Sequence, residues 1–382
     1  MRIAYVTETW PPEVNGVAMT ASRTVSFLRD KGHSVDLIRP RQGALAESSQ
    51  SAPAMLVPGV PIPMYQDVRF GAPLPGQLRR AWIANRPDLV HVATEGLLGY
   101  RAVKSAVSLG IPVTSDFRTR FDVYTRYYAP ALLTRIVRIY LRSFHNKCAL
   151  TFVPTEEMRD LLEAEGFCRV EVSSRGVDSK ALSPAQHRQD LRDSWSKTGP
   201  VALYVGRLAR EKNLHLVFKA FDAIRARNPN AALVVVGDGP LRAELEARHP
   251  YAIFAGTRRG VELSQYFASA DIFLFPSLSE TFGNVTLEAM ASGLAVIAYR
   301  SAAAGMHVKN GVNGLVVAPH DEAAFCEAAA RLGGNQLLRR RLAVAARQTA
   351  TQLDWGQILA KFELALRRIA DQPIDHEHAL VA

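Results

Sequence analysis

Short runs of apolar residues recur along the chain, and most are followed by a polar loop and a segment with helical periodicity. Apolar runs without a helical period are typical of strands buried on both faces of a parallel sheet. The runs in the first half cover residues 2–6, 35–38, 88–92, 111–115, 149–153 and 170–172. Those in the second half cover residues 201–205, 232–236, 251–254, 271–275 and 294–298. This alternation predicts an α/β fold with two doubly wound sheets that face one another.

The domain organisation follows from changes in composition along the 382 residues. Residues 179–199 are rich in Ser, Gln, Arg and Asp, and we interpret them as a linker. The chain then divides into an N-terminal domain of residues 1–178 and a C-terminal domain of residues 200–354. Six prolines between residues 52 and 76 predict an irregular, extended segment in the first domain.

One strand–loop–helix unit in the second domain carries candidate chemistry. The apolar run 271–275 ends at Pro276, a polar loop follows, and a helix is expected to start near Val285 and to end before Gly293. Such a loop lies at the carboxyl end of a strand and the amino end of a helix, where open α/β sheets bind anionic ligands.

Two carboxylates, Glu280 and Glu288, frame this loop. The amides of Phe282, Gly283 and Asn284 lie between them and have no partners within the first helical turn. Acceptors that flank a row of donors suit a polyhydroxylated ligand that also carries negative charge. The alternative is that Glu288 is a solvated first-turn acid that favours the helix dipole and that Glu280 is an ordinary loop residue.

Two other strand ends carry residues of interest. Gly16 follows the first strand at the start of a predicted helix, where glycine lets the backbone approach a ligand closely. The sequence lacks G-x-G-x-x-G there, so a dinucleotide cofactor is poorly supported. Arg207 and Lys212 follow the strand that opens the second domain, where a fixed cation would stabilise a leaving phosphate by roughly 3 kcal/mol. Taken singly, each is equally an ordinary surface cation.

The most basic segment runs from Arg118 to Lys147, with seven Lys or Arg residues against one acid. From residue 131 its apolar positions recur at helical spacing, while Arg135, Arg138 and Arg142 share one face. The pattern suggests a helix that lies on an anionic membrane surface. The alternative is a packed helix with a solvated basic face. No recognition motif supports binding to nucleic acid.

Composition narrows the class of protein further. The net charge of +10 points to an acidic partner such as a nucleotide phosphate or an anionic membrane. The three cysteines show neither metal-ligand spacing nor a disulfide framework, which fits a reducing cytoplasm. We find no signal peptide and no apolar stretch of about 18 residues. We therefore expect a cytoplasmic protein. A further expectation is that it lies peripherally on the inner face of the cell membrane.

The motifs in order resemble family 4 of the retaining glycosyltransferases. Glu280 and Glu288 with seven residues between them resemble its E-x7-E signature. The other matching pieces are Gly206-Arg207, Lys212-Asn213, Gly237-Asp238-Gly239-Pro240, Ala270-Asp271, Pro276-Ser277, Asn313-Gly314 and Trp355. The resemblance covers nearly the whole chain. It implies a GT-B fold of two Rossmann-like domains across a cleft, with a final helix, residues 355–375, that packs back on the first domain. It also implies no catalytic metal and no cofactor.

Carried over residue by residue, the resemblance implies a set of donor-binding residues. Arg207 and Lys212 would bind the diphosphate of a GDP- or UDP-linked sugar, Glu280 would hold the sugar hydroxyls and Glu288 the ribose. The full set of donor-binding candidates is Asn15, Gly16, Gly206, Arg207, Lys212, Gly256, Glu280, Thr281, Phe282, Gly283, Asn284, Val285 and Glu288. The implied catalysis is a retaining, front-face transfer in which the leaving phosphate oxygen assists deprotonation of the attacking hydroxyl.

Two positions depart from the family pattern. Asn15 precedes Gly16 where paired glycines are usual, and Arg118 stands where a histidine is expected. We place Arg118 with Glu280, Arg207 and Lys212 among the catalytic candidates, in contact with sugar, phosphate or an acidic acceptor.

Within the family the chain looks most similar to the branch of bacterial GDP-mannose-dependent mannosyltransferases and sulfoquinovosyl-diacylglycerol synthases. We expect transfer of a mannose- or glucose-type hexosyl group to a lipid or lipid-linked acceptor at the membrane, with no nucleic acid as partner. The alternatives are a soluble acceptor such as a sugar phosphate, and a sugar-nucleotide epimerase or binding protein on the same fold.

Overall fold

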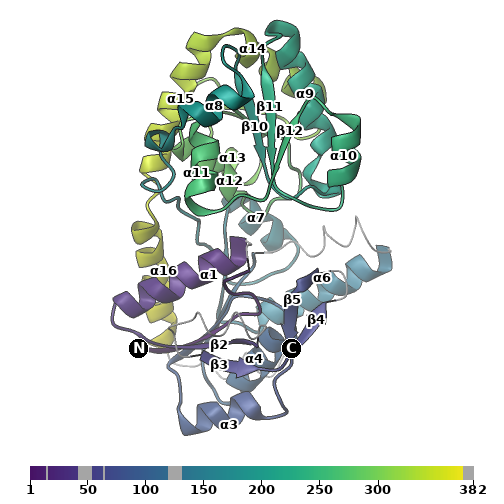
Figure 1. Ribbon diagram of the computed structural model, residues 1–382. Helices are drawn as coiled ribbons and strands as arrows, with labels where there is room; N and C mark the ends of the chain where they lie inside the picture. Colours follow the sequence, from purple (N-terminus) through teal and green to yellow (C-terminus); the bar gives the residue numbers. More distant parts are fainter. Residues whose placement is uncertain (14–15, 42–53, 63–64, 119–130, 373–382) are drawn as a thin grey trace. The chain divides into compact units, whose positions relative to one another are not determined.

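The computed structural model describes residues 1–13, 16–41, 54–62, 65–118 and 131–372 (Figure 1). The chain forms two compact units. The first comprises Met1–Ser174 and Gly356–Ala382, and the second comprises Arg175–Trp355. The chain therefore passes between the units twice, once after Ser174 and once after Trp355.

The first unit is built on a seven-stranded sheet with the order β3-β2-β1-β6-β7-β8-β9, in which all neighbouring strands are parallel. Its strands are β1 (Arg2–Val6), β2 (Ser34–Pro40), β3 (Ala54–Val57), β6 (Leu89–Val92), β7 (Val113–Asp116), β8 (Leu150–Val153) and β9 (Val170–Val172), with a separate antiparallel ribbon of β4 (Gly59–Ile62) and β5 (Tyr65–Gly71). Its helices are α1 (Gly16–Asp30), α3 (Gln77–Ala84), α4 (Leu97–Ser108), α6 (Ala131–Asn146), α7 (Glu156–Ala164) and, at the end of the chain, α16 (Trp355–Ala370).

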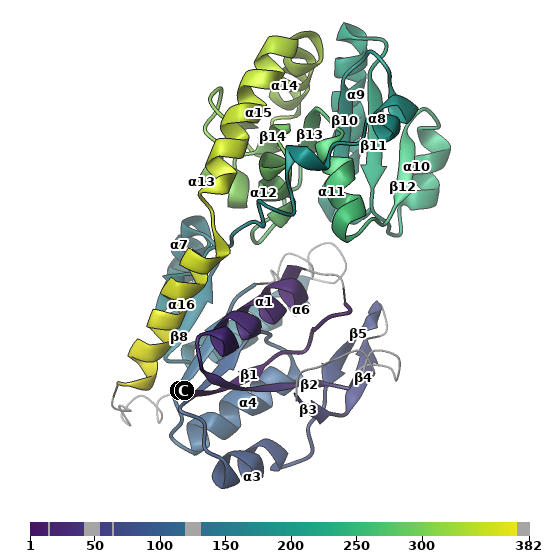
Figure 2. The same cartoon turned by 60° about the vertical axis from the view of Figure 1, so that its left-hand side comes forward.

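Helices cover both faces of this sheet. Alternate residues of a strand point to opposite faces, and β1 shows this directly. Ile3 and Tyr5 belong to an apolar cluster that includes residues of α1 and α16, whereas Ala4 and Val6 belong to a second cluster with residues of α3, α4 and α6. Figure 2 shows α1 on one side of β1 and β2, and α3 and α4 on the other. Both faces of β1 are therefore buried, which explains its unbroken apolar run.

The second unit contains a six-stranded parallel sheet with the order β12-β11-β10-β13-β14-β15. Its strands are β10 (Val201–Val205), β11 (Ala232–Val236), β12 (Ile253–Gly256), β13 (Ile272–Phe275), β14 (Ala295–Tyr299) and β15 (Leu315–Val317). Its helices are η1 (Pro184–Gln186), α8 (Gln189–Trp195), η2 (Arg210–Lys212), α9 (Leu214–Arg227), α10 (Arg242–Arg248), α11 (Gly260–Ala268), α12 (Asn284–Ala291), α13 (Ala302–His307), α14 (Glu322–Gly334) and α15 (Gln336–Thr351).

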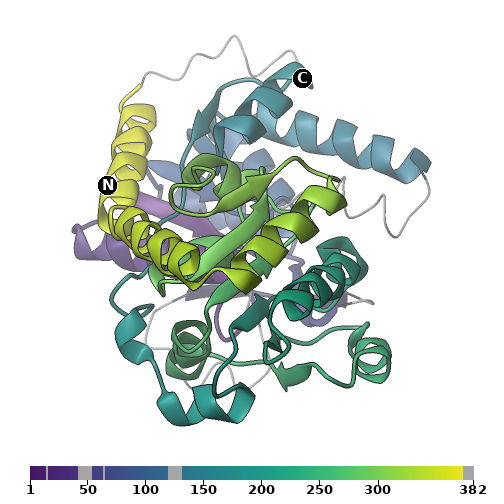
Figure 3. The ribbon, with the colours of Figure 1, turned by 90° about the horizontal axis from the view of Figure 1, so that it is seen from above.

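Helices of the second unit pack in pairs, α9 against α14 and α12 against α15 (Figure 3). One large apolar core runs through the sheet and these helices. The prediction of two doubly wound parallel α/β sheets is confirmed.

The expectation for residues 52–76 is wrong, because the described part of this segment contains β3, β4 and β5. β3 adds to the edge of the main sheet by pairing with β2, and β4 pairs only with β5. Proline lacks an amide donor and is tolerated on edge strands. Pro58 lies between two strands and Pro61 lies on the two-stranded ribbon, so neither interrupts a central ladder.

The polar segment 179–199, which we interpreted as a linker, carries structure of its own. It contains η1 and α8, and it belongs to the second unit. Trp195 of α8 packs against Tyr266 with ring centroids 5.1 Å apart, and Arg192 forms an ion pair of 3.0 Å with Asp271. A few anchors thus hold a largely polar segment onto the core.

The last helix, α16, is held on the first unit by aromatic packing. Phe362 is 3% exposed, and its ring centroid lies 4.7 Å from that of Phe152 and 5.2 Å from that of His91. Phe362→Ala should lower the free energy of unfolding by about 3 to 5 kcal/mol, because the truncation leaves a cavity in the core. Denaturant unfolding followed by circular dichroism measures the loss.

Leu364→Ala is the matched control for this variant, since Leu364 is on the same helix and 66% exposed. The control should stay within about 0.5 kcal/mol of the parent protein. Equal losses for the two variants would contradict the packing of α16 described here.

Candidate active site

The candidate donor site forms where two neighbouring strands of the second sheet end. β10 ends at Val205 and is followed by Gly206 and Arg207, then by η2 and α9. β13, which pairs with β10, ends at Phe275 and is followed by the loop 276–283 and by α12. Because both strands run in parallel, the two loops leave the same edge of the sheet, as the sequence pattern predicts.

Four hydrogen bonds fix these loops: three join one loop to the other, and one lies within the loop 276–283. Lys212 Nζ lies 2.5 Å from Glu280 Oε1. Ser277 Oγ donates to the same carboxylate oxygen at 2.8 Å. Asn213 Nδ2 donates to the Pro276 carbonyl at 3.4 Å, and Ser279 Oγ donates to the Glu211 carbonyl at 3.2 Å. The structure therefore brings Lys212 and Glu280 together from opposite loops.

The ion pair is shielded from solvent on both sides. The side chains of Lys212 and Glu280 are 13% and 17% exposed. Tyr204 lies buried on β10, and its hydroxyl donates to the Arg207 carbonyl at 3.2 Å. Burial raises the pKa of Tyr204 well above its usual value, and the negative charge of Glu280 raises it further. Tyr204 therefore stays a neutral donor next to the candidate site.

The turn before α12 aims backbone amides at the same edge. Gly283 has φ of 80° and ψ of 61°, the left-handed conformation that glycine adopts without strain. A β-carbon at this position would lie 3.3 Å from Glu280 Cγ, so the loop is tightly folded on the carboxylate. Asn284 and Val285 open α12, where the first amides have no partner within the helix.

The remaining predicted residues of the second unit spread along one edge of the sheet. Glu288 is half-buried on α12, one turn after Asn284. Thr281 is half-buried in the loop. Gly206 leads directly into Arg207, whereas Gly256 ends β12, two strands away from β10. The Gly237 amide donates to the Gly256 carbonyl at 2.9 Å, which gives Gly256 a role in joining β11 and β12.

The predicted residues of the first unit lie at the carboxyl edge of the first sheet. Gly16 opens α1, and its carbonyl accepts from Thr20 Oγ1 at 2.7 Å. Asn15 lies outside the described residues. Arg118 follows β7 and binds Asp116 with two nitrogens, Nε at 2.5 Å and Nη2 at 3.1 Å. The family's histidine position is thus held by an arginine that already has an acidic partner.

Burial alone would raise the pKa of Asp116, but the Arg118 guanidinium and His91 outweigh it and hold the pKa below its usual range. Asp116 is therefore a fixed carboxylate that orients Arg118. The Arg118 side chain is 7% exposed, and its Nη1 has no hydrogen-bond partner among the residues that the structure describes. A buried donor without a partner is costly, so Nη1 is the part of Arg118 whose hydrogen bonding the described residues leave incomplete.

Sequence reasoning missed two buried carboxylic acids at this edge, Glu8 after β1 and Glu95 after β6. Burial raises the pKa of Glu8 to about 7, although the Leu98 amide donates to its Oε1 at 2.8 Å. Burial also raises the pKa of Glu95, which lies 3.5 Å from the buried His145. The sequence did carry a signal for Glu8 and Glu95, because each follows an apolar strand. The carboxyl ends of parallel strands meet at one edge of a sheet, where ligands bind.

The sequence also did not reveal the buried arginine Arg175. It begins the second unit, is 5% exposed, and donates from Nη1 to Asn284 Oδ1 at 3.2 Å. The two residues are 109 positions apart, and no local pattern links them.

Helix α6 carries an exposed apolar stripe, formed by Leu132, Leu133, Ile136, Ile139 and Tyr140. Leu132 is 71% exposed, and Ile136 and Ile139 are 54% and 51% exposed. The opposite side, including Leu141 and Phe144, is buried. Of the three arginines predicted to share a basic face, Arg138 forms an ion pair with Glu165, and Arg142 donates to the Glu165 carbonyl at 3.4 Å. Arg135 is exposed.

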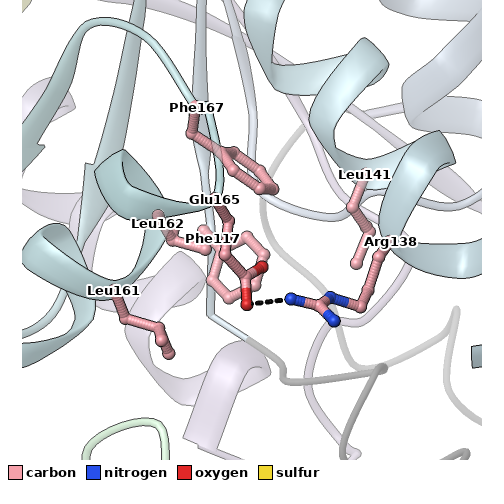
Figure 4. Close-up of a pocket in the computed structure, with 7 residues that line it drawn as sticks. All are labelled: Phe117, Arg138, Leu141, Leu161, Leu162, Glu165 and Phe167. Carbon is pink, nitrogen blue, oxygen red and sulfur yellow. Dashed lines mark hydrogen bonds and ion pairs between the residues drawn. The ribbon is translucent and has the colours of Figure 1, made fainter. Parts of the chain in front are cut away.

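The Arg138–Glu165 pair borders a pocket between α6 and α7 (Figure 4). The pocket is otherwise lined by apolar side chains, namely Phe117, Leu141, Leu161, Leu162 and Phe167. It contains none of the predicted site residues, so we treat it as part of the packing that holds α6 on the sheet. No helix in the described part of the chain is long and apolar enough to span a bilayer.

Solved structures with a similar fold superpose over nearly the whole chain. Sucrose-phosphate synthase from Thermosynechococcus elongatus superposes with a TM-score of 0.75 at 18% identity, covering 96% of this chain and 98% of that one. The Anabaena protein Alr3699/HepE in complex with UDP superposes with a TM-score of 0.76 at 18% identity, covering 96% of this chain and 100% of that one. The predicted GT-B fold is confirmed.

Sequence comparison identifies the family. The description "Glycosyltransferase Family 4" matches residues 14–181, and "Glycosyl transferases group 1" matches residues 199–335. A GDP-mannose-dependent alpha-mannosyltransferase of Mycolicibacterium smegmatis is 32% identical over 381 residues, covering 96% of this chain and 98% of the relative. The sulfoquinovosyl transferase SQD2 of Arabidopsis thaliana is 30% identical over 372 residues, covering 94% of this chain and 72% of the relative.

A further relative is named as a glycolipid synthase, the alpha-monoglucosyldiacylglycerol synthase of Streptococcus pneumoniae. It is 30% identical over 319 residues, covering 78% of this chain and 71% of the relative. The chain belongs to glycosyltransferase family 4, and it is a nucleotide-sugar hexosyltransferase.

Proposed function

We propose that this enzyme transfers a mannose- or glucose-type hexosyl group from a GDP- or UDP-linked sugar to a lipid or lipid-linked acceptor at a membrane surface. The transfer retains the anomeric configuration and uses neither a metal ion nor a cofactor. The observation that carries the donor half is the Lys212–Glu280 pair beside the amino end of α12.

The donor's diphosphate fits the cationic side of this site. Lys212 Nζ is already fixed by Glu280 at 2.5 Å, so little side-chain freedom is lost when a phosphate arrives. Arg207 stands on the same loop, directly after β10. Two fixed cations would stabilise the charge that develops on the leaving phosphate, the part that a metal ion performs in other transferases.

The sugar and the nucleoside fit the acidic side. Glu280 is an acceptor for sugar hydroxyls, and the first amides of α12 are donors for sugar or phosphate oxygens. Glu288, one helical turn further on, would accept from the ribose hydroxyls. In a retaining front-face transfer the leaving phosphate oxygen takes the proton of the attacking hydroxyl, so the enzyme needs no separate general base. Its contribution is placement and charge stabilisation.

The acceptor half is assigned to the first unit. Arg118 Nη1, Gly16 and the buried acids Glu8 and Glu95 lie at the carboxyl edge of its sheet. Arg118 is oriented by Asp116 and would donate to a hydroxyl or a phosphate oxygen of the acceptor or the transferred sugar.

The membrane part of the proposal is supported by α6. Its exposed apolar stripe would insert among lipid acyl chains, and the exposed Arg135 would meet anionic headgroups. The same helix is tied to the acceptor edge, because the Tyr140 hydroxyl donates to the Glu95 carbonyl at 2.5 Å. The Streptococcus pneumoniae relative, which is named as a monoglucosyldiacylglycerol synthase, adds support.

A soluble acceptor such as a sugar phosphate is the alternative within the family, and Arg118 Nη1 would serve it equally well. The deciding experiment incubates the protein with radiolabelled GDP- and UDP-sugars and either diacylglycerol-containing vesicles or sugar phosphates. Label in the lipid fraction supports the proposal, and label in the sugar phosphate alone overturns its acceptor half. Release of neither product, with conversion of the donor instead, would indicate an epimerase.

The donor site predicts that Lys212→Ala and Glu280→Ala each lower kcat/KM at least 100-fold, since each removes a group that acts on the transition state. Initial rates with the preferred donor measure the loss. Lys219→Ala is the matched control, because Lys219 forms an exposed pair with Glu322 at 3.0 Å in the same unit. Rates within threefold of the parent protein for the two site variants would refute the assignment.

If the transfer needs no metal ion, about 5 mM EDTA should leave its rate within twofold of the untreated rate, because Arg207 and Lys212 supply the positive charge. Proton NMR of the same product should show the anomeric configuration of the donor. A rate that collapses with EDTA and returns with Mg²⁺ or Mn²⁺ would contradict the proposal.

The membrane proposal predicts that the protein floats with vesicles containing anionic lipid and that salt reduces the floating fraction. Ile136→Ser combined with Ile139→Ser should abolish flotation, because it removes half-exposed apolar area from α6. The control is Leu337→Ser with Val344→Ser, which changes two exposed apolar residues on α15. A floating fraction that does not change with lipid charge, with salt or with the α6 substitutions would contradict this part of the proposal.

A further inference from the structure

Arg175 is a buried cation at the amino end of α12, and the donor site described above does not account for it. It is the first residue of the second unit and follows β9 by three positions. The residue is only 5% exposed, and arginine is almost never buried to this extent unless its charge has a partner.

Two contacts fix the Arg175 side chain on the donor loop. Nη1 donates to Asn284 Oδ1 at 3.2 Å, and the guanidinium carbon lies 5.8 Å from the centre of the Phe282 ring. The second contact is a cation–π interaction, which guanidinium makes readily. Arg175 thus touches the residues on both sides of Gly283.

Gly283 is the point where the loop turns into α12, so a clamp on its neighbours sets the turn. Phe282 is 2% exposed, and its carbonyl accepts from the Ala303 amide at 2.8 Å. Burial and this hydrogen bond hold Phe282 on one side of the turn. On the other side, Arg175 holds the side chain of Asn284.

The effect reaches Glu280 through a tight contact. A β-carbon on Gly283 would lie 3.3 Å from Glu280 Cγ and 3.6 Å from its Cβ, so the backbone of the turn lies against the carboxylate side chain. Glu280 in turn holds Lys212 Nζ at 2.5 Å. A shift of the turn at Gly283 would therefore displace the ion pair as well as the amides of α12.

Arg175 also stands at the place where the chain passes between its two units. The Val177 amide donates to the Leu353 carbonyl at 3.0 Å. A β-carbon on Gly176 would lie 2.8 Å from that same carbonyl and 2.9 Å from the Trp355 nitrogen. The two ends of the second unit, residues 175–177 and 353–355, thus lie side by side and share a hydrogen bond directly beside the arginine.

We propose that Arg175 is a positioning residue for the donor: it holds the turn at Gly283 in the conformation that binds the sugar nucleotide, and it ties that turn to the paired ends of the second unit. This inference rests on the proposed function, because it concerns the same donor site. Arg175 acts through Asn284 and Phe282, and it takes no part in bond making or breaking.

The test uses Arg175→Met, which keeps a long side chain and removes the charge and the hydrogen bond. We expect kcat/KM for the donor to fall about ten- to a hundredfold, the usual range for losing a hydrogen bond to a charged group. The KM for the donor should rise while the KM for the acceptor stays within twofold, whereas a general loss of folding would lower the apparent kcat and leave both KM values unchanged. Arg175→Lys should recover little, because an ammonium cannot both stack on Phe282 and reach Asn284 in a planar geometry.

Arg347→Met is the matched control. Arg347 is a half-buried arginine at the opposite end of α12, where its Nη1 donates to the Ala291 carbonyl at 2.6 Å and to the Leu182 carbonyl at 2.8 Å. This variant should lose stability in thermal unfolding and keep the donor kcat/KM within threefold. The Arg175→Met, Asn284→Ala double variant should be no worse than the more damaged single variant, since both changes break one contact.

The inference is overturned if Arg175→Met retains donor kcat/KM within threefold, if Arg347→Met matches its loss, or if the double variant loses the product of the two single effects. A second measurement separates this from failure of the proposed function. Hydrogen exchange of the amides in residues 281–286, in the protein without ligand, should become at least tenfold faster in Arg175→Met and should not change in Arg347→Met. Unchanged exchange overturns the positioning role, whereas absence of transfer by the parent protein overturns the proposed function alone.

Discussion

The ion pair between Lys212 and Glu280 joins the loops that follow two neighbouring strands, and the geometry of the proposed donor site depends on it. Removing two charges from water is unfavourable, and the Coulomb attraction at 2.5 Å together with the Ser277 hydrogen bond offsets this cost. Such a pair contributes little to stability but fixes both groups in space. A negatively charged ligand that approaches the pair would meet a lysine that is already oriented. The pair is therefore better explained by binding than by folding.

The fold could be read from the sequence because its signals are local. Apolar runs such as 201–205 mark strands buried on both faces, and the polar loops after them mark the ligand edge. The segment 52–76 departs from the prediction, because proline interrupts a strand only where a central ladder needs its amide. Pro61 lies on a two-stranded ribbon where no such ladder exists. Local composition does not tell an edge strand from an irregular segment.

The site was predictable only in part, for a related reason. Glu280 and Glu288 lie on one loop and helix, so their spacing shows in the sequence. The position of Lys212 after a strand indicates the same edge of the sheet, but its contact with Glu280 depends on β10 and β13 being neighbours, which the sequence does not show. Arg175 could not be placed at all, since its contact with Asn284 joins positions 109 residues apart and uses two residue types without a shared motif. Burial of an arginine is a property of three-dimensional packing, and no spacing rule records it.

Helix α6 shows what the structure adds where the sequence leaves two interpretations open. Its periodicity is the same for a packed helix with a basic outer face and for a helix that offers apolar residues to a membrane. Exposure separates them, because Leu132 and Ile136 are unburied while Arg138 is held by Glu165. The side facing outward is thus largely apolar, and the arginines serve in part to fasten the helix to α7. An exposed apolar stripe costs solubility, and a helix retains it most readily where another surface covers it.

The arginine at position 118 changes what the first unit can recognise. A histidine can donate or accept a hydrogen bond, and its charge depends on pH, whereas arginine is a permanent cation with donors only. Asp116 compensates that charge through two hydrogen bonds, so the pair is nearly neutral and the cation does not attract anions over distance. What remains is one buried donor, Nη1, with a fixed direction. Such a donor selects for an acceptor atom at one place, a hydroxyl or a phosphate oxygen. The substitution therefore narrows the geometry of binding at the first unit more than it changes the charge there.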